Sequence, residues 1–242
     1  MKLAICTATM RPDTGQLPGD LPLVVSQATT MPRVYVRYNT PENNLGVVGS
    51  YDHLYRKTVE WSIEDEEVVC FVHDDVIVRE RGWDERVLKE FKDPDVGVVG
   101  FGGAAGHASD DIYRTPYRLQ QLGRSGYRSN VDDAEVHGER FKGEADVAVL
   151  DGFCLCVRRE FLARVDGWKS ILNAGIDFIG YDYYLCGLAH RLGYRIRVVG
   201  IECHHRGGGT SVGMQVDRQK EYDYSHKRIY DDLKDVLPWR CA

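Results

Sequence analysis

Two adjacent carboxylates follow a short apolar run in the first third of this 242-residue chain. The run 68–72 leads into His73, Asp74 and Asp75. A short apolar run bounded by polar residues predicts a buried strand. Two aspartates at its end are costly to bury unless a cation meets them. A divalent metal that carries a sugar-nucleotide diphosphate would supply this charge. A polar turn with both carboxylates solvated is the alternative interpretation.

Strand and helix patterns alternate over the first hundred residues and place more polar side chains beside this pair. Strands are expected over Lys2–Thr9, Arg33–Tyr38, 68–72 and 96–101. This alternation predicts a mostly parallel sheet with helices on both faces, and ligands bind such sheets beyond the carboxyl ends of the strands. The polar residues at these predicted ends are Thr7, Thr9, Asn39, Asp74 and Asp75.

The second half of the chain continues the pattern after an irregular stretch. Residues 102–146 are rich in glycine, arginine and acidic residues, and we expect an elaborated loop region there rather than a separate domain. A strand over 148–157 is interrupted by Asp151 and Gly152. A helix starts near Tyr181 and ends at Gly193, a residue type that commonly terminates helices. A strand over 195–201 and a C-terminal helix over 215–236 follow.

Bulk composition excludes some classes of protein. The formal charge of −6 and the 43% hydrophobic content are typical of a globular protein and give no support for general nucleic-acid or anionic-membrane binding. No apolar run approaches 18 residues, and the N-terminus has no signal-peptide pattern. The seven scattered cysteines indicate reduced thiols and a cytoplasmic protein. We expect Cys154 and Cys156 on opposite faces of a strand, without a zinc site.

The order of motifs resembles the GT-A-fold glycosyltransferases of family 2, and more closely their glycosyltransferase-like branch, in which His-x-Asp replaces Asp-x-Asp. The motifs that carry the resemblance are 71–76, Gly82-Trp83, 97–100, 151–159, 180–185, 193–196 and His204-His205. The resemblance implies one α/β, GT-A-like domain over 1–242. Its parts would be a nucleotide-sugar-binding half (1–101), an acceptor-side half (102–210) and a C-terminal helix (211–242).

The same resemblance assigns the donor side of the site. Asp75 and His204 would hold the metal, and an imidazole ligand suits Mn²⁺ better than Mg²⁺. Adjacent side chains on a strand face opposite ways, so only one of His204 and His205 can point into the cleft. His205 is then expected to be a core or loop histidine. The residues expected to contact the nucleotide or sugar are His73, Asp74, Thr7, Thr9, Asn39 and, through a phosphate, Arg11.

On the acceptor side the resemblance makes Asp182 the base of an inverting, single-displacement reaction. Partial burial between aromatic residues would raise the pKa of Asp182. A helix N-cap is the alternative role for this residue, and the two roles are compatible. Asp151 would position the acceptor or the sugar. Asp177 is a weaker candidate for the base.

We therefore expect a metal-dependent glycosyltransferase that uses a UDP-linked donor and a hydroxyl acceptor. The acceptor would be a glycan, a lipid or a hydroxylated base in viral DNA. The last option arises from residues 112–131, which hold four arginines, interleaved tyrosines and no acidic residue. A solvated loop is the alternative for that stretch. A nucleotidyltransferase and a non-catalytic nucleic-acid or glycan-binding module are the competing functions.

Overall fold

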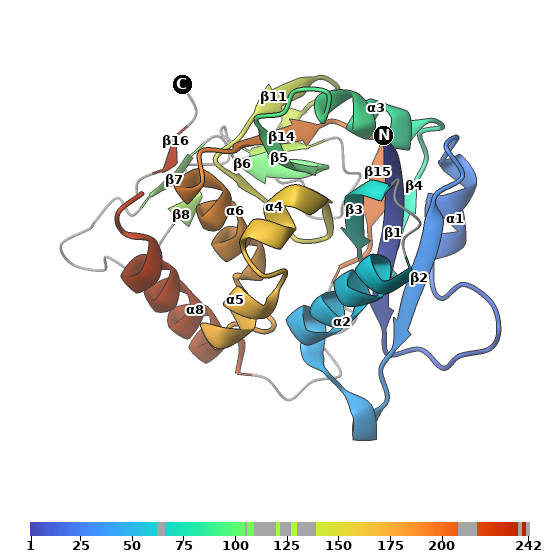
Figure 1. Ribbon diagram of the computed structural model, residues 1–242, viewed down its shortest axis with the longest axis horizontal. Helices are drawn as coiled ribbons and strands as arrows, with labels where there is room; N and C mark the ends of the chain where they lie inside the picture. The colour runs from blue at the N-terminus through green and yellow to red at the C-terminus, as the bar shows by residue number, and fades with distance from the viewer. Residues whose placement is uncertain are drawn as a thin grey trace.

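A seven-stranded sheet runs through the centre of the protein (Figure 1). The computed structural model describes residues 1–61, 66–104, 106–108, 120–121, 127–129, 139–207, 217–236 and 239–240. The strands of the central sheet lie in the order β11-β14-β5-β13-β3-β1-β2. Their bounds are β1 (Lys2–Thr9), β2 (Arg33–Tyr38), β3 (Glu66–Val72), β5 (Val96–Gly100), β11 (Glu144–Asp146), β13 (Cys154–Arg158) and β14 (Arg195–Val199).

Five strands of the central sheet run in one direction. β1 pairs in parallel with both β2 and β3, and β14 pairs in parallel with β5. β13 lies antiparallel between β3 and β5, and β11 is antiparallel at the edge beside β14. The sheet is therefore mixed but mostly parallel, as the alternating sequence pattern predicts. This arrangement brings the carboxyl ends of β1, β2 and β3 to one edge, where the start of β13 also lies.

Helices cover both faces of the sheet, as predicted (Figure 1). Alternate residues of β3 divide between two apolar clusters, because successive side chains on a strand point to opposite faces. Val69 and Phe71 pack with α2, α4, α5, α6 and α8, whereas Val68, Cys70 and Val72 pack with α1 and α3. The helices are α1 (Leu21–Gln27), α2 (Gly46–Trp61), α3 (Trp83–Glu90), α4 (Arg159–Arg164), α5 (Lys169–Asn173), α6 (Tyr181–Arg191), α8 (Arg218–Leu233) and the 3-10 helix η1 (Pro41–Asn43).

A small two-stranded sheet brings distant parts of the chain together beside the carboxyl end of β3. β4 (Val76–Val78) pairs antiparallel with β15 (Cys203–His205), and the register sets His205 opposite Val76. The backbone N–H of Arg206 also donates to the carbonyl of Asp75 at 3.2 Å. These bonds place the residues after β14 directly over the two adjacent aspartates.

Where the sequence predicts a loop region over 102–146, the described residues include short strands, which pair with one another and with short strands later in the chain. Their bounds are β6 (Gly102–Ala104), β7 (Gly106–Ala108), β8 (Gln120–Gln121), β9 (Tyr127–Ser129), β10 (Glu139–Arg140), β12 (Val149–Leu150) and β16 (Trp239–Arg240). β10, β9, β6 and β12 form a four-stranded sheet, and β16, β7 and β8 form a three-stranded one. The arginines and tyrosines of 112–131 lie outside the residues whose side chains are described, so the prediction of an acceptor-binding loop stays a prediction.

One further prediction differs from the structure, and one helix of the structure was not predicted. The single strand expected over 148–157 is two strands in two sheets, β12 and β13, because the segment 151–153 leaves the ladder between them. The helix α1 directly follows a proline-rich stretch and lacks a strong sequence signal, because seven residues are too few to show a helical period. It buries only Leu21 and Val24.

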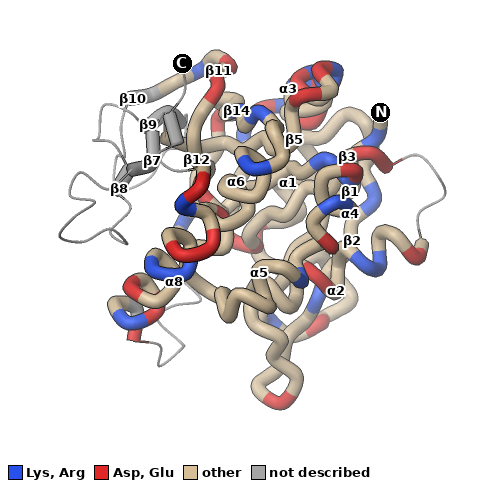
Figure 2. The backbone as a smooth tube through the Cα atoms, turned by 60° about the vertical axis from the view of Figure 1, so that its left-hand side comes forward, with Lys and Arg blue, Asp and Glu red and all other residues tan. Residues whose placement is uncertain are grey.

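Charges of both signs alternate along the surface of α8 (Figure 2). Lys227 pairs with Asp231 and Arg228 with Asp232 at 2.7 Å, and Arg191 of α6 reaches Asp235. Such pairs at the helical i,i+4 spacing give the helix a solvated face of mixed charge. Within the described ranges, no helix combines the length and apolar character needed to cross a bilayer.

Candidate active site

Three potential metal ligands converge at the carboxyl end of β3. His73, Asp75 and His205 each offer one ligand atom, and these atoms lie within 4.8 Å of one another. The Oδ1 of Asp75 lies 3.4 Å from Nε2 of His205 and 4.0 Å from Nδ1 of His73. Two ligands that each lie about 2.0–2.6 Å from one cation are at most about 5 Å apart. The spacing of the three groups is therefore compatible with one shared ion.

The histidine beside Asp75 is His205, whereas the family resemblance favoured His204 as the metal ligand. The antiparallel pairing of β15 with β4 explains the difference, because His205 lies opposite Val76, next to Asp75, and His204 lies opposite Ile77. The two imidazoles then point to opposite faces of β15. The ring of Phe153 stacks on His205 with ring centroids 4.9 Å apart and an interplanar angle of 20°, which fixes the ring of His205 toward the aspartate.

The electrostatics of Asp75 suit a cation. Its Oδ1 is buried and has no hydrogen-bond partner among the described residues. Burial opposes ionisation of this carboxyl, but the imidazoles of His205 and His73 outweigh it and lower the pKa of Asp75. Desolvation, assisted by the neighbouring His205, lowers the pKa of His73 and favours its neutral form. An ionised carboxylate with a free buried oxygen, flanked by imidazoles, fits a divalent transition metal better than it fits Mg²⁺.

Asp74 turns away from this group and belongs to a second polar cluster. Its Oδ2 accepts a 2.5 Å bond from Oγ1 of Thr9 and a 3.1 Å bond from Nε of Arg11. Its carbonyl accepts from the backbone N–H of Asp20 at 2.8 Å. A Cβ on Gly19 would come within 2.1 Å of that carbonyl, so only glycine fits there. Asp74 thus joins the end of β1 to the loop before α1.

The other residues predicted to contact the nucleotide or sugar are partly buried and partly at the surface. Thr7 is fully buried, and its hydroxyl donates to the carbonyl of Val72. This hydrogen bond connects β1 to β3. Asn39 is 6% exposed, and its Nδ2 donates to Oγ of Ser50 at 2.8 Å. Arg11 keeps 56% of its side chain exposed beside Asp74. The structure therefore brings Thr9, Arg11 and Asp74 together and places Thr7 below them as support.

Asp182 lies in the first turn of α6 and faces the segment before β13. Its Oδ2 accepts from the N–H of Gly152 at 3.0 Å, and its Oδ1 accepts from the N–H of Tyr183 at 2.9 Å. The N-cap position is occupied by Gly180, so Asp182 is not the N-cap. Burial, followed by the negative charge of Asp151, raises the pKa of Asp182 to about 7. A carboxylate with this pKa can take a proton near neutral pH.

Asp177 has a structural role elsewhere. Its Oδ1 accepts from the backbone N–H of Val48 at 3.1 Å in the first turn of α2. A Cβ on Gly46, whose φ is +69°, would lie 1.7 Å from the Asp177 carboxylate. The carboxyl of Asp177 therefore completes the N-terminus of α2, as negative groups at helix starts do.

Tyr181 also belongs to the candidate site, although the sequence analysis did not predict it as a site residue. The hydroxyl of Tyr181 lies 3.0 Å from Nε2 of His73 and donates to the carbonyl of Gly152 at 3.2 Å. The sequence places Tyr181 in an aromatic helical stripe, which is a pattern typical of core residues. Only its position next to Asp182 signalled that it belongs to the same site.

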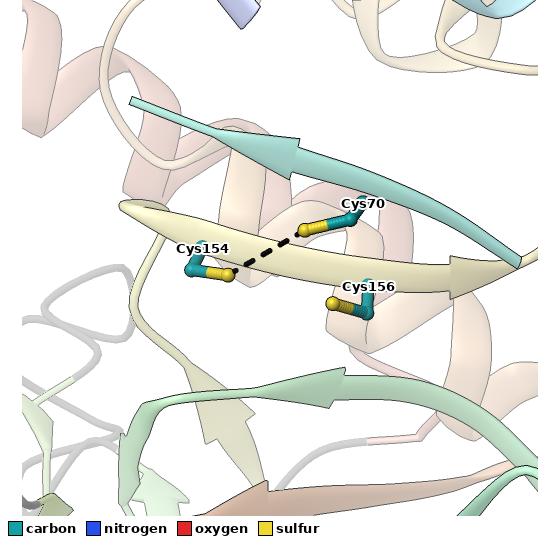
Figure 3. A group of neighbouring side chains, drawn as sticks. All are labelled: Cys70, Cys154 and Cys156. Carbon is teal, nitrogen blue, oxygen red and sulfur yellow. Dashed lines mark hydrogen bonds between the residues drawn. The ribbon is translucent and has the colours of Figure 1, made fainter. Parts of the chain in front are cut away.

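A second group of potential metal ligands lies inside the core. Figure 3 shows Cys70 on β3 facing Cys154 and Cys156 on β13, with 3.7 Å between the sulfurs of Cys70 and Cys154. Contrary to expectation, Cys154 and Cys156 share a face, because residues two apart on a strand point the same way. Burial raises the pKa of both Cys154 and Cys156. These neutral thiols pack among apolar side chains. All six cysteines of the described ranges are free.

The fold is that of the GT-A glycosyltransferases. A model of the glycosyltransferase-like family matches residues 50–226, so the chain belongs to this family and is a glycosyltransferase. No curated protein sequence matches it significantly.

A solved glycosyltransferase structure shows the same fold. The mannosyltransferase PcManGT from Pyrobaculum calidifontis, in complex with GDP-Man and Mn²⁺, superposes with a TM-score of 0.50. It is 10% identical, over 94% of this chain and 69% of that one. S. aureus TarS 1-349 superposes with a TM-score of 0.49 at 11% identity, over 96% of this chain and 72% of that one.

Proposed function

We propose that the protein transfers a sugar from a UDP-linked donor to a hydroxyl acceptor, with inversion, and uses a divalent metal held by Asp75, His205 and His73. The metal would be Mn²⁺ or, less favoured by imidazole ligands, Mg²⁺. The observation that carries the proposal is the orphaned, buried Oδ1 of Asp75 between two imidazoles. The PcManGT structure holds Mn²⁺ together with a nucleotide sugar, and this supports the same pairing here.

The metal would neutralise the charge that develops on the departing diphosphate. Around that position, this chain supplies the groups that hold the donor. The cluster of Thr9, Arg11 and Asp74 lies one residue from Asp75 and offers a cation and hydroxyl to the nucleotide. Asn39 follows the end of the neighbouring strand β2, and its backbone N–H donates to the carbonyl of Thr9 at 2.8 Å. Thr7 maintains the spacing of β1 and β3 and touches no ligand in this proposal.

The acceptor hydroxyl loses its proton to Asp182. Because the pKa of Asp182 is about 7, a substantial fraction of this carboxylate is ionised at neutral pH. It is also basic enough to accept the proton of the hydroxyl. Asp151, whose charge raises that pKa, orients the acceptor or the sugar. In a single displacement with inversion, the acceptor hydroxyl would attack the sugar carbon from the side opposite the departing diphosphate, and Asp182 would act on the acceptor's side.

The proposal places the protein in a reducing compartment, the cytoplasm. The six described cysteines are all thiols, and three of them lie close enough to react if oxidised. The acceptor is proposed only as a hydroxyl, on a glycan, a lipid or a modified nucleic-acid base.

The test is turnover of a panel of UDP- and GDP-sugars with Mn²⁺, with Mg²⁺ and with EDTA. We expect release of UDP from one donor, slow with water as acceptor and strongest with Mn²⁺. Release that is equally fast in EDTA would overturn the metal assignment. Release from GDP-sugars alone would overturn the choice of nucleotide and keep the metal assignment.

A further inference from the structure

A continuous hydrogen-bonded chain connects the two halves of the site through Gly152. The N–H of Gly152 donates to the Asp182 carboxylate at 3.0 Å, and its carbonyl accepts from the Tyr181 hydroxyl at 3.2 Å. The same hydroxyl lies 3.0 Å from Nε2 of His73. The backbone N–H of His73 in turn donates to the carbonyl of Phe153 at 2.9 Å. His73 is therefore attached to the start of β13 by both its backbone and its ring.

Counting donors on this chain fixes which nitrogen of His73 carries the proton. A tyrosine hydroxyl has one hydrogen to donate and two lone pairs. Tyr181 is 5% exposed, and its hydrogen satisfies the carbonyl of Gly152, which otherwise would lack this partner. With that hydrogen used, Nε2 of His73 is assigned as the donor to a lone pair of the Tyr181 hydroxyl, and Nδ1 of the neutral ring is left without a hydrogen.

The geometry points to Tyr181 as a positioning residue that holds His73 in the Nε2–H tautomer and turns the lone pair of Nδ1 toward Asp75. Nδ1 lies 4.0 Å from Oδ1 of Asp75, which is too long for a hydrogen bond but within the span of two ligands on one ion. His73 thereby changes from the nucleotide contact expected from the sequence to a third ligand. The inference deepens the proposed function, on which its metal-binding consequence rests.

Gly152 is the residue that permits this contact. A Cβ at position 152 would lie 2.4 Å from the Tyr181 hydroxyl oxygen and 2.7 Å from the ring carbon that bears it. The Tyr181 ring cannot yield easily, because it lies among the aromatic side chains of Tyr51 and Trp168. Any larger residue at position 152 would displace the Tyr181 hydroxyl from His73. The ring of His73 would then no longer be held in one tautomer.

The decisive measurement is the tautomer of His73 in the metal-free protein. At pH 8 an imidazole of ordinary pKa is neutral. We expect long-range ¹H–¹⁵N spectra of ¹⁵N-labelled protein to show His73 protonated at Nε2, with assignment by loss of the signal in His73→Gln. In Tyr181→Phe we expect a mixture of both tautomers. Protonation of Nδ1 in the wild-type protein, or an unchanged tautomer in Tyr181→Phe, would overturn the inference.

The second readout is Mn²⁺ affinity, measured by EPR of free Mn²⁺. Tyr181→Phe should weaken Mn²⁺ binding by about tenfold, because groups that orient a histidine ligand typically contribute 10- to 100-fold. The matched control is Tyr184→Phe, on the same helix, which removes a hydroxyl that instead binds Asp232 at 2.9 Å. Its Mn²⁺ affinity should equal that of the wild-type protein, and an equal loss in both variants would contradict a specific role for Tyr181.

The two readouts separate this inference from the proposed function. Wild-type protein that shows the Nε2–H tautomer but binds no Mn²⁺ would overturn the proposed metal site and support the role of Tyr181 in orienting His73. Wild-type protein that binds Mn²⁺ with the opposite tautomer would keep the proposed function and overturn the inference.

Discussion

Adjacent histidines on β15 have different surroundings, and this difference gives a paired test at the residue scale. His205→Gln should weaken Mn²⁺ binding at least about tenfold, or about 1.4 kcal/mol, because it removes a ligand beside the orphaned oxygen of Asp75. EPR would measure this effect. The control is His204→Gln on the opposite face of the strand. A loss confined to His204→Gln would reverse the assignment.

Asp75→Asn should abolish Mn²⁺-dependent UDP binding, which equilibrium dialysis would measure.

The raised pKa of Asp182 predicts a pH profile and a variant that separates binding from transfer. The base must be ionised, so the rate should rise with pH through about 7 and then level off. Asp182→Asn should transfer at less than about one-hundredth of the wild-type rate while it binds UDP and Mn²⁺ normally. Initial rates between pH 5.5 and 8.5 and dialysis would test this. Full turnover by the variant would remove Asp182 from the base role.

The same pKa has a consequence for stability. Folding favours the neutral form of Asp182, so this side chain destabilises the folded protein as pH rises from about 4 through about 7. Asp182→Asn lacks this effect. Its free energy of unfolding relative to wild type should therefore increase by about 1–3 kcal/mol between pH 5 and pH 8. Urea denaturation at both pH values gives this difference, and a constant difference would contradict the pKa.

Residue types, strand ends and the family resemblance indicated most members of the candidate site. Asp75 and Asp182 were expected from the resemblance, together with their places at a strand end and a helix start. The choice between His204 and His205 depends on the register of β15 against β4, which joins segments more than a hundred residues apart. Tyr181 could not be predicted either, because its role depends on a backbone contact with Gly152 across the fold.

At the scale of elements, α2 depends on a carboxylate that comes from a distant loop. Asp177→Ala removes the acceptor for the N–H of Val48, and it should lower the free energy of unfolding by about 1–2 kcal/mol, as lost helix caps do. Chemical denaturation would measure the loss. The control is Asp223→Ala on the exposed face of α8, expected to change stability by less than about 0.5 kcal/mol. Equal effects would show that Asp177 contributes nothing particular to α2.

The central strands were predictable because each combines an apolar run with clear boundaries. β1 and β2 match their predicted ranges, and α6 begins at Tyr181, where a helix start was predicted. α1 was not predicted because a helix of seven residues is too short to show a helical period in the sequence. The division of 148–157 between two sheets was missed because strand patterns do not encode which neighbour a strand will pair with.

At the scale of the whole molecule, ligand binding should be visible as added stability. A ligand that binds only the folded protein at about 100 times its Kd adds about 2.7 kcal/mol. For a chain of this length, this corresponds to a rise in Tm of about 5–10 °C. We expect this shift with UDP and Mn²⁺ together, and its loss with EDTA. An equal shift from UDP in EDTA would mean that donor binding needs no metal.

The pairing of β15 with β4 also bears on how the protein is made. Asp75 emerges early in synthesis, whereas His205 arrives some 130 residues later, so the two side chains can meet only after most of the chain has been made. A nascent or proteolytically shortened chain that ends before β15 would retain much of its core but lack the third side chain needed to grip an ion. In the proposed function, such fragments would leave nucleotide sugars intact, and catalytic competence would coincide with completion of the fold.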